Sequence, residues 1–324
     1  MRALVLTGPS ATADRTEIRE VAEPLPGPGE VTVEVTHAGI NFKEVMQRRG
    51  DPEWVPGWPL VPGMEVAGVV RRLGAGVDSP APGQRVAGYA GTGGLAEVAT
   101  VRADLAVPVP DEVTLRDAAA VPVVLATALI LLADAGRVAA GETVLVHSAG
   151  GGVGTALARL APLYGVARLI GTTGRADRAG AVRDAGYELA LVRDGGLVDA
   201  VREVAPAGVD LILDPLGTVA LDDDLAMVAP GGRIVLFGNA AGGPPELPTL
   251  YRLMAANVSI GGMAISGLVA KAPHRVAGAM RQVLDLLAAG KLAYPVTEVP
   301  LADVPGVHQA LADGRGAGKY VARL

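Results

Sequence analysis

Residues 143–165 read TVLVHSAGGGVGTALARLAPLYG and hold five glycines, four of which lie between an apolar run and a segment rich in Ala and Leu. A run of this kind is either a surface loop or a backbone cradle for a phosphate group. This one directly follows an apolar strand and opens a helix at Val153, where glycines let a pyrophosphate approach the backbone and the helix N-terminus. The context favours a dinucleotide cradle, with Ala149, Gly151 and Gly154 at the three positions of the G-x-G-x-x-G pattern.

Apolar strands alternate with helical segments beyond residue 121. The expected strands span 143–148, 168–173, 189–192, 209–215, 232–238 and 258–262, and the expected helices span 153–164, 175–185, 196–205, 218–229 and 247–256. Strands that are apolar on both faces are typical of a parallel sheet covered by helices on two sides. Six of them predict a doubly wound Rossmann domain.

The two ends of the chain have a different pattern. The first third consists of short Val-rich runs separated by Gly and Pro turns, which predicts a mostly β domain. A helix expected at 274–290 is followed by short β-like pieces that do not continue the alternation. We therefore predict an α/β protein in which residues 1–122 and 264–324 form one discontinuous domain and residues 123–263 form the Rossmann domain.

Composition excludes several classes of protein. The 324 residues carry a formal charge of −6 and no cysteine, which removes disulfides, thiolate nucleophiles and zinc sites that need Cys. A negative net charge disfavours nucleic acid and anionic membrane surfaces as partners. The longest apolar stretch, residues 121–133, is too short to cross a bilayer and contains a proline. The N-terminal apolar run is too short for a signal peptide, so we expect a cytoplasmic protein.

The end of the second Rossmann strand indicates which dinucleotide binds. An NAD site has a carboxylate there for the ribose 2′-hydroxyl, whereas this chain has Thr172, Thr173 and Gly174. Arg175 and Arg178 follow within one helical turn, and guanidinium groups suit a 2′-phosphate. The pattern favours NADP(H) as the cofactor, the alternative being that both arginines are solvated surface residues.

Several ordered segments together resemble the zinc-independent medium-chain dehydrogenase/reductases of the quinone oxidoreductase (ζ-crystallin) type, which are related to the enoyl reductase domains of polyketide synthases. They are PGPGEVTVEVTHAGINFKEVMQRRG, PLVPGMEVAGVVRRLGAGV, PGQRVAGYAGTGGLAEVA, VLATAL, VLVHSAGGGVGTALARLA, GRIVLFGNAAG and GAGKYVARL. The resemblance implies a GroES-like substrate domain into which the Rossmann domain is inserted, with an active cleft between them. It also implies a homodimer, for which the apolar segment 257–263 would supply an edge strand.

The resemblance also implies where the nicotinamide and the 2′-phosphate lie. Asn41 and Thr127 match positions that line the nicotinamide, although each could instead bond only local backbone. Arg178 matches a lysine position at the 2′-phosphate, and Arg193 replaces a tyrosine near the adenine, leaving its role open between stacking and a phosphate contact. With the cradle, the expected cofactor-binding residues are Asn41, Thr127, Ala149, Gly151, Gly152, Val153, Gly154, Thr173, Arg175, Arg178, Arg193, Phe237, Gly238, Asn239 and Lys319.

No metal is expected, because zinc-dependent relatives have PGHE where this chain has PGME with Met64. Hydride transfer to an acceptor that is already electrophilic, a quinone or an enone, is the remaining chemistry. Reduction of a C=C bond also needs a proton, but the tyrosine that enoyl reductases carry is missing from DPEW, residues 51–54. Solvent or Tyr89 could replace it, so the catalytic candidates are Asn41, Thr127 and Tyr89.

Other polar and aromatic residues give weaker signals. Lys43 and Glu44 could face the cleft or form a surface ion pair, and Trp54 and Trp58 could line an acceptor site or only pack. His147, like His37, is expected to be a packed or backbone-bonded residue rather than a catalyst.

Two further functions remain open on the sequence alone. One is a free-standing enoyl-thioester reductase that accepts substrate from an acyl carrier protein, with QRRG (47–50) and VVRRLG (69–74) as a basic docking patch. The other is a non-catalytic NADPH-binding protein.

Overall fold

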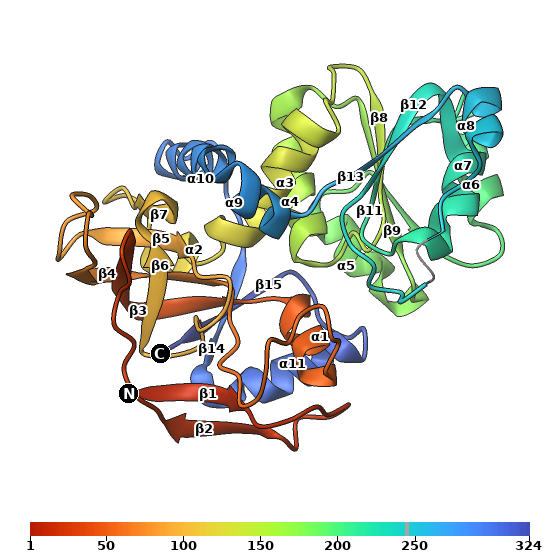
Figure 1. The fold of residues 1–324 in the computed structure, drawn as a ribbon. Helices are drawn as coiled ribbons and strands as arrows, with labels where there is room; N and C mark the ends of the chain where they lie inside the picture. The colour runs from red at the N-terminus through yellow and green to blue at the C-terminus, as the bar shows by residue number, and fades with distance from the viewer. Residues whose placement is uncertain (244–245) are drawn as a thin grey trace. The chain divides into compact units, whose positions relative to one another are not determined.

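The structure, a computed structural model, describes residues 1–243 and 246–324. It divides into two compact units, Met1–Ala126 with Leu268–Leu324, and Thr127–Gly267. Within the described residues, Figure 1 shows the first as mostly β and the second as a sheet with helices on its faces.

In the first unit, the described residues form a seven-stranded sheet in the order β14-β15-β3-β4-β5-β7, with β6 paired to β3, and a separate two-stranded sheet, β1-β2. The strands are β1 (Arg2–Leu6), β2 (Thr16–Glu20), β3 (Glu30–Ile40), β4 (Glu65–Leu73), β5 (Arg85–Tyr89), β6 (Val98–Arg102), β7 (Ala106–Pro108), β14 (Val296–Pro300) and β15 (Lys319–Arg323). Its α-helices are α1 (Phe42–Arg49), α2 (Leu115–Ala118), α10 (Pro273–Ala288) and α11 (Val304–Ala312), and α9 (Ile265–Lys271) leads into it from the second unit.

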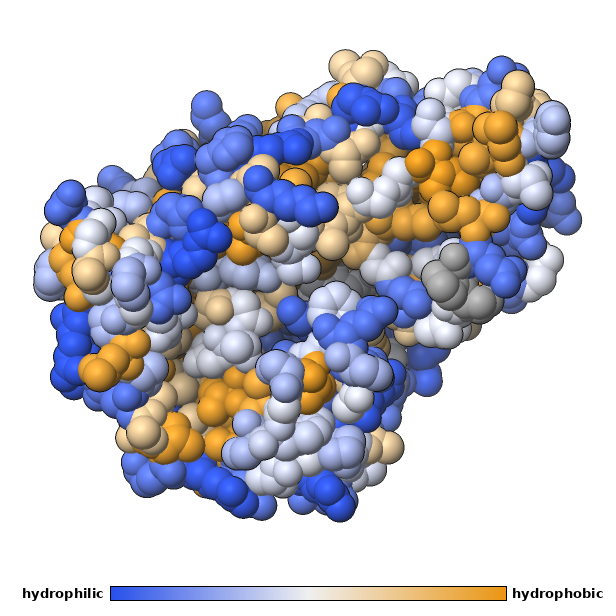
Figure 2. All heavy atoms as spheres, in the orientation of Figure 1, coloured by the Kyte–Doolittle hydropathy of each residue, from blue (hydrophilic) through white to orange (hydrophobic). Residues whose placement is uncertain are grey.

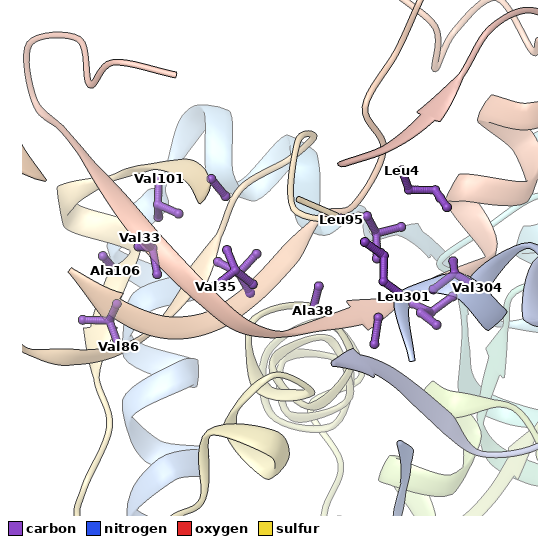
Figure 3. Close-up of a cluster of buried hydrophobic side chains, with 14 of the residues drawn as sticks. Leu4, Val33, Val35, Ala38, Val86, Leu95, Val101, Ala106, Leu301 and Val304 are labelled. Atoms are coloured by element: carbon purple, nitrogen blue, oxygen red, sulfur yellow. The ribbon is translucent and has the colours of Figure 1, made fainter. Parts of the chain in front are cut away.

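The core of this unit explains why the C-terminal segment belongs to it. Figure 3 shows Val33 and Ala38 of β3 in one cluster with Leu4 from the N-terminus and with Leu301 and Val304 from the C-terminal segment. All five are buried. Because their apolar area leaves water only when both ends of the chain meet, the discontinuous arrangement follows from hydrophobic burial.

The second unit is a Rossmann fold. Over the described residues its six strands lie in the order β10-β9-β8-β11-β12-β13, and every neighbouring pair is parallel. The strands are β8 (Thr143–Val146), β9 (Arg168–Thr173), β10 (Leu189–Val192), β11 (Val209–Asp214), β12 (Val228–Leu236) and β13 (Ser259–Gly262). The predicted six-stranded doubly wound sheet is confirmed, and its order reverses beside β8, where such folds bind dinucleotides.

Helices connect the strands of this sheet. Leu197 of α6 and Leu221 of α7 pack in one cluster with β8, β9, β11 and β12, whereas α4 contacts α5. The helices are α3 (Ala126–Ile130), α4 (Gly152–Leu160), α5 (Ala179–Ala185), α6 (Leu197–Val204), α7 (Leu221–Met227) and α8 (Leu250–Ala256).

Several predicted boundaries are wrong for local reasons. The first Rossmann strand ends at Val146, not residue 148, because Ser148 has φ 53° and turns the chain into the cradle. The helix expected at 153–164 ends at Leu160 and continues as a 3-10 turn that contains Pro162. The helix expected from 247 begins at Leu250, after Thr249 accepts a hydrogen bond from its first turn.

Candidate functional site

The glycine run forms a turn tied to two strands. The Ala149 N–H donates to the Thr172 carbonyl at the end of β9 (3.0 Å), and the Gly151 N–H donates to the Ser148 carbonyl (3.0 Å). α4 begins at Gly152, so the positive end of its helix dipole lies at this turn. The segment is therefore an ordered helix N-terminus able to receive an anion, rather than a loose loop.

Gly154 and Gly151 of the cradle are glycines for different physical reasons. A Cβ at Gly154 would lie 2.4 Å from the Ala149 carbonyl oxygen, so this glycine allows the helix to pack against its own entry turn. Among the described residues, a Cβ at Gly151 would meet only the Ser148 carbonyl oxygen, at 3.2 Å. Gly151 thus leaves space above the turn that packing alone does not require, which fits the approach of a phosphate.

The two arginines expected to bind a 2′-phosphate, Arg175 and Arg178, lie in different surroundings. Arg175 is exposed and bidentate with Asp177, with Nε 3.0 Å and Nη2 2.7 Å from its carboxylate oxygens. Arg178 ends the 3-10 turn before α5, and Thr173 accepts the Arg175 N–H at 3.3 Å. Arg175 is therefore already partnered by a carboxylate that would repel a phosphate.

Arg193 lies at the same end of β9 from the neighbouring strand. Its Nη1 donates to the Thr172 hydroxyl (3.0 Å), and its backbone N–H donates to the Thr173 carbonyl (2.7 Å). A Cβ at Gly174 would lie 3.0 Å from Nη2, so the guanidinium lies against the backbone at the place where an NAD site has its carboxylate. Burial lowers the pKa of Arg193, although Asp214 and Asp224 oppose the shift.

A buried polar network lies behind Arg193. His147 places Nδ1 2.7 Å from the Thr172 hydroxyl and Nε2 2.7 Å from the Asp224 carboxylate, and both side chains of the ion pair are fully buried. The prediction that His147 is a packed residue is confirmed. Burial raises the pKa of Asp224, and burial followed by the nearby Asp224 raises the pKa of Asp214 to about 6.

The loops after β11 and β12 are bonded to each other. The Phe237 N–H donates to the Asp214 carbonyl (2.8 Å), and a Cβ at Gly238 would lie 2.7 Å from the Pro215 carbonyl oxygen. Asn239 is exposed and donates to the Gly243 carbonyl (3.3 Å). Phe237, Gly238 and Asn239, three of the expected cofactor-binding residues, thus lie on a loop held at the carboxyl end of the sheet.

Asn41 belongs to a buried polar cluster in the first unit. Its Nδ2 donates to the Glu65 carboxylate (3.1 Å) and to the Gly39 carbonyl (3.3 Å), and its backbone N–H donates to Glu44 (3.0 Å). Lys319 donates from Nζ to Asn41 Oδ1 (2.9 Å) and to Glu65 Oε1 (2.5 Å). Asn41 is more than a turn residue, because an ion pair fixes both ends of its amide.

Thr127 lies in a helical segment with an unusual start. Residues Val121–Leu125 form a π-helical turn that runs directly into α3, and π turns occur often at functional sites. Thr127 is buried, and among the described residues its hydroxyl has no hydrogen-bond partner. The alternative in which it bonds its own helix is therefore not observed.

Tyr89 and Lys43 are both partly removed from water. Burial, with the Glu65 charge, raises the pKa of Tyr89 to about 12, so the phenol stays neutral and is a weak acid at neutral pH. Lys43 lies with its ammonium 4.8 Å from the centre of the Trp54 ring, and burial lowers its pKa. Trp54 and Trp58 are half-buried.

Two expectations about charged residues are wrong. Glu44 does not form a surface ion pair, because its side chain is fully buried and its Oε2 lies 3.1 Å from Nε2 of His308. Residues 47–50 are not an exposed basic patch, because Arg48 is fully buried and donates to the Ala11 carbonyl (2.9 Å). His37 is half-buried, and its Nε2 lies 3.2 Å from the Glu298 carboxylate, so its partners are side chains rather than backbone.

Sequence reasoning missed Glu65, the carboxylate at the centre of the Asn41 cluster. A signal was available, since Glu65 opens the apolar strand EVAGVV and Lys319 opens the apolar strand KYVARL. Opposite charges that each begin an apolar strand indicate a buried ion pair, because a buried charge needs a partner.

The described residues do not fit a resident zinc ion. They contain no group of three or more His, Cys, Asp or Glu side chains placed to hold a metal, and the chain has no cysteine. Within residues 1–243 and 246–324, no helix combines the length and apolar character needed to cross a membrane.

Two family models match the chain. Residues 27–111 match the alcohol dehydrogenase GroES-like domain, and residues 152–288 match a domain described as a zinc-binding dehydrogenase. The chain is 30% identical to pig quinone oxidoreductase over 309 residues, covering 94% of this chain and 92% of the relative. It is 30% identical to the human synaptic vesicle membrane protein VAT-1 homolog over 340 residues, covering 99% and 86%. Escherichia coli quinone oxidoreductase complexed with NADPH matches with a TM-score of 0.90 and 25% identity over 100% of both chains.

Proposed function

Because this chain belongs to the medium-chain dehydrogenase/reductase family, in its quinone oxidoreductase type, we propose that it transfers a hydride from NADPH to a quinone or an activated C=C bond without zinc. The observation that carries the proposal is the end of β9, where the place of an NAD-type carboxylate is taken by Gly174 and the Arg193 guanidinium. An acid there would repel a 2′-phosphate, whereas a guanidinium attracts it.

The protein's own residues would bind and orient the cofactor. The N–H groups at the start of α4 would hold the pyrophosphate, with Gly151 leaving room for it. Arg193 and Arg178 would hold the 2′-phosphate. The loop at Phe237–Asn239 would border the nicotinamide, as would Asn41 and Thr127, which are the proposed catalytic residues. When bound, NADPH supplies the hydride.

The residues near Asn41 favour an acceptor that needs no Lewis acid. Lys319 is the cation of the Asn41 cluster, and its three N–H groups are taken by Ile40, Asn41 and Glu65. Simple ketones need stronger polarisation of the carbonyl than a neutral amide supplies. Quinones and enones are already electrophilic, so positioning by the protein is sufficient for them.

The proton for a C=C substrate has a different source from the hydride. The high pKa of Tyr89 makes this phenol a weak donor at neutral pH. Water is a weaker acid still, so we propose that the α-carbon takes its proton either from Tyr89 or from solvent. A quinone acceptor imposes no such requirement, because its reduced oxygens exchange protons with solvent.

Enzymatic turnover distinguishes this function from its rivals. Purified protein should oxidise NADPH in the presence of 1,4-quinones or α,β-unsaturated carbonyl compounds, and much more slowly with NADH. Tight NADPH binding with no turnover on either acceptor class would contradict the proposal and favour a non-catalytic NADPH-binding protein. A carrier-bound enoyl thioester reduced far faster than the free enone would favour an enoyl-thioester reductase, whose docking patch cannot include the buried Arg48.

We also propose that the protein forms a homodimer through the β13 edge of the Rossmann sheet. β13 ends the strand order, and its Ser259, Gly261 and Gly262 are exposed. Large apolar side chains are exposed on α8 nearby in the chain, with Tyr251 82% and Met254 62% accessible. Figure 2 shows an apolar surface on the part of this unit that carries α8. A second copy would cover both the apolar side chains and the open strand edge.

A further inference from the structure

Glu65 connects four separate segments of the chain. It is the first residue of β4, and its side chain is fully buried. Its Oε1 accepts from Lys319 of β15 and from Asn41 before α1, and its Oε2 accepts from the backbone N–H of Val123 (2.7 Å). Gly39 on β3 makes room for it, because a Cβ at that position would lie 2.3 Å from Oε1.

The hydrogen-bond donors of Lys319 and of the Asn41 amide are all used within the cluster. Lys319 has three N–H groups, which point to Ile40, Asn41 and Glu65. The two N–H groups of the Asn41 amide are likewise used by Glu65 and Gly39. Asn41 Oδ1 accepts from Lys319 and also faces the Glu44 backbone N–H in the capping box of α1. The cluster therefore fixes the Asn41 amide in one orientation.

Glu65 also holds the start of the helical segment that leads to Thr127. The Val123 N–H lies in the first turn of that segment, where intrahelical acceptors are missing, and Glu65 supplies the acceptor. Thr127 follows four residues later in the chain. One carboxylate thus constrains the segments that carry both proposed catalytic residues.

We propose that Glu65 is a positioning residue for hydride transfer, which orients the Asn41 amide and fixes the helical segment preceding Thr127. The inference rests on the proposed function and adds a residue that contacts neither cofactor nor acceptor. Lys319 is its charge partner, so its contribution is also to position Asn41 rather than to bind a phosphate.

The test uses Glu65→Gln together with the doubly neutral Glu65→Gln/Lys319→Met. In Glu65→Gln, the side-chain NH₂ group faces a hydrogen-bond donor in either orientation of the amide. The reason is that both carboxylate oxygens of Glu65 accept hydrogen bonds in the wild-type protein. The double variant removes both buried charges and so avoids an unpaired ion. It should fold and still lack the carboxylate.

Two measurements separate positioning from stability. The rate of single-turnover hydride transfer in the double variant should fall about tenfold to 100-fold, the scale expected for a small misplacement of reacting groups. Binding of 2′,5′-ADP, which reports only the adenosine end, should stay within about twofold of wild type, whereas NADPH binding should weaken. Glu142→Gln is the matched control, since it breaks a partly buried ion pair with Arg233 in the Rossmann unit. It should lower stability and leave both measurements unchanged.

A folded double variant with wild-type hydride transfer and wild-type NADPH binding would overturn the proposal. The binding comparison needs no acceptor, so it also separates this inference from the proposed function. If wild-type protein reduces no quinone or enone, the proposed function fails, and a selective loss of NADPH binding would still support the positioning role.

Discussion

Arg193 donates a hydrogen bond from Nη1 to the Thr172 hydroxyl, 3.0 Å away, and thereby places its guanidinium at the carboxyl end of β9. Thr172 in turn contacts His147, which pairs with Asp224. The guanidinium is thus held by a buried network before any ligand binds. A preorganised group loses less conformational entropy on binding than a free surface arginine does.

Arg193→Gln should therefore weaken NADPH binding by about tenfold or more, the scale of a lost charged hydrogen bond, and should leave NADH binding nearly unchanged. Titration of the two cofactors with wild type and variant gives the ratio directly. Arg175→Gln is the control, because Arg175 is already paired with Asp177, and it should have a smaller effect. Equal weakening of NADPH and NADH by the Arg193 substitution would contradict a 2′-phosphate role.

The sequence was sufficient for the architecture and for part of the site. Apolar strands alternating with helices predicted the parallel sheet, because the inner strands β8, β9 and β11 are largely buried on both faces and so are mostly apolar. The cradle at Gly151 was predictable because it depends on neighbours in the chain. Glu65 could have been suspected as a buried charge at the start of an apolar strand, but its partners could not be identified, since Asn41 and Lys319 lie 24 and 254 residues away.

The burial of Arg48 was also missed. QRRG looks like a solvated basic patch, yet Arg48 is buried and donates to the Ala11 carbonyl, whereas Arg49 is exposed. Local sequence could not distinguish these two arginines, because which face of a short helix is buried depends on the elements that pack against it.

The cradle glycines should respond differently to alanine. Gly154→Ala places a Cβ 2.4 Å from a backbone carbonyl oxygen, which cannot move cheaply, so we expect a loss of about 1–3 kcal/mol in the free energy of unfolding. In Gly151→Ala, the part of the chain that the structure describes places only the Ser148 carbonyl oxygen near the new Cβ, at 3.2 Å, and the backbone angles are ordinary, so stability should change little. Its NADPH affinity should nevertheless fall at least about tenfold, because the Cβ occupies the phosphate's path. Urea unfolding and cofactor titration check both variants, and unchanged NADPH affinity in Gly151→Ala would argue against the cradle.

The proposed dimer should be sensitive to charge on α8. Tyr251→Glu alters a residue that is 82% exposed within one chain, so the fold of the chain should be unaffected. If a second copy covers this surface, the buried carboxylate should shift the protein toward monomer by several-fold or more at micromolar concentration. Sedimentation velocity measures the shift, with the exposed Lys271→Glu on α9 as control. A wild-type protein that sediments as a monomer would contradict the interface.

Asp214 should make stability depend on pH in the direction opposite to that of an ordinary salt-bridged carboxylate. Its carboxyl is buried, faces Asp224, His147 and Arg193, and has one oxygen without a hydrogen-bond partner among the described residues. Burial and Asp224 raise its pKa from 3.8 to about 6, so between these values the folded state binds more protons than the unfolded state. The contribution of this group therefore favours the fold below about pH 4, is lost as the pH rises through 6, and stays lost above it.

Asp214→Asn should remove this penalty, because the amide is uncharged at every pH. The interval from 3.8 to about 6 corresponds to at most about 3 kcal/mol, so the variant should be more stable than wild type at pH about 7.5 and the difference should shrink toward pH about 4. Urea unfolding across this range measures the difference, with Asp285→Asn on the exposed face of α10 as the control. Parallel stability curves for wild type and Asp214→Asn would show that the buried carboxyl is not protonated in the fold. A converging pair would instead mean that the polar network behind Arg193 carries a stability cost at neutral pH, retained because it holds the guanidinium where the proposed 2′-phosphate binds.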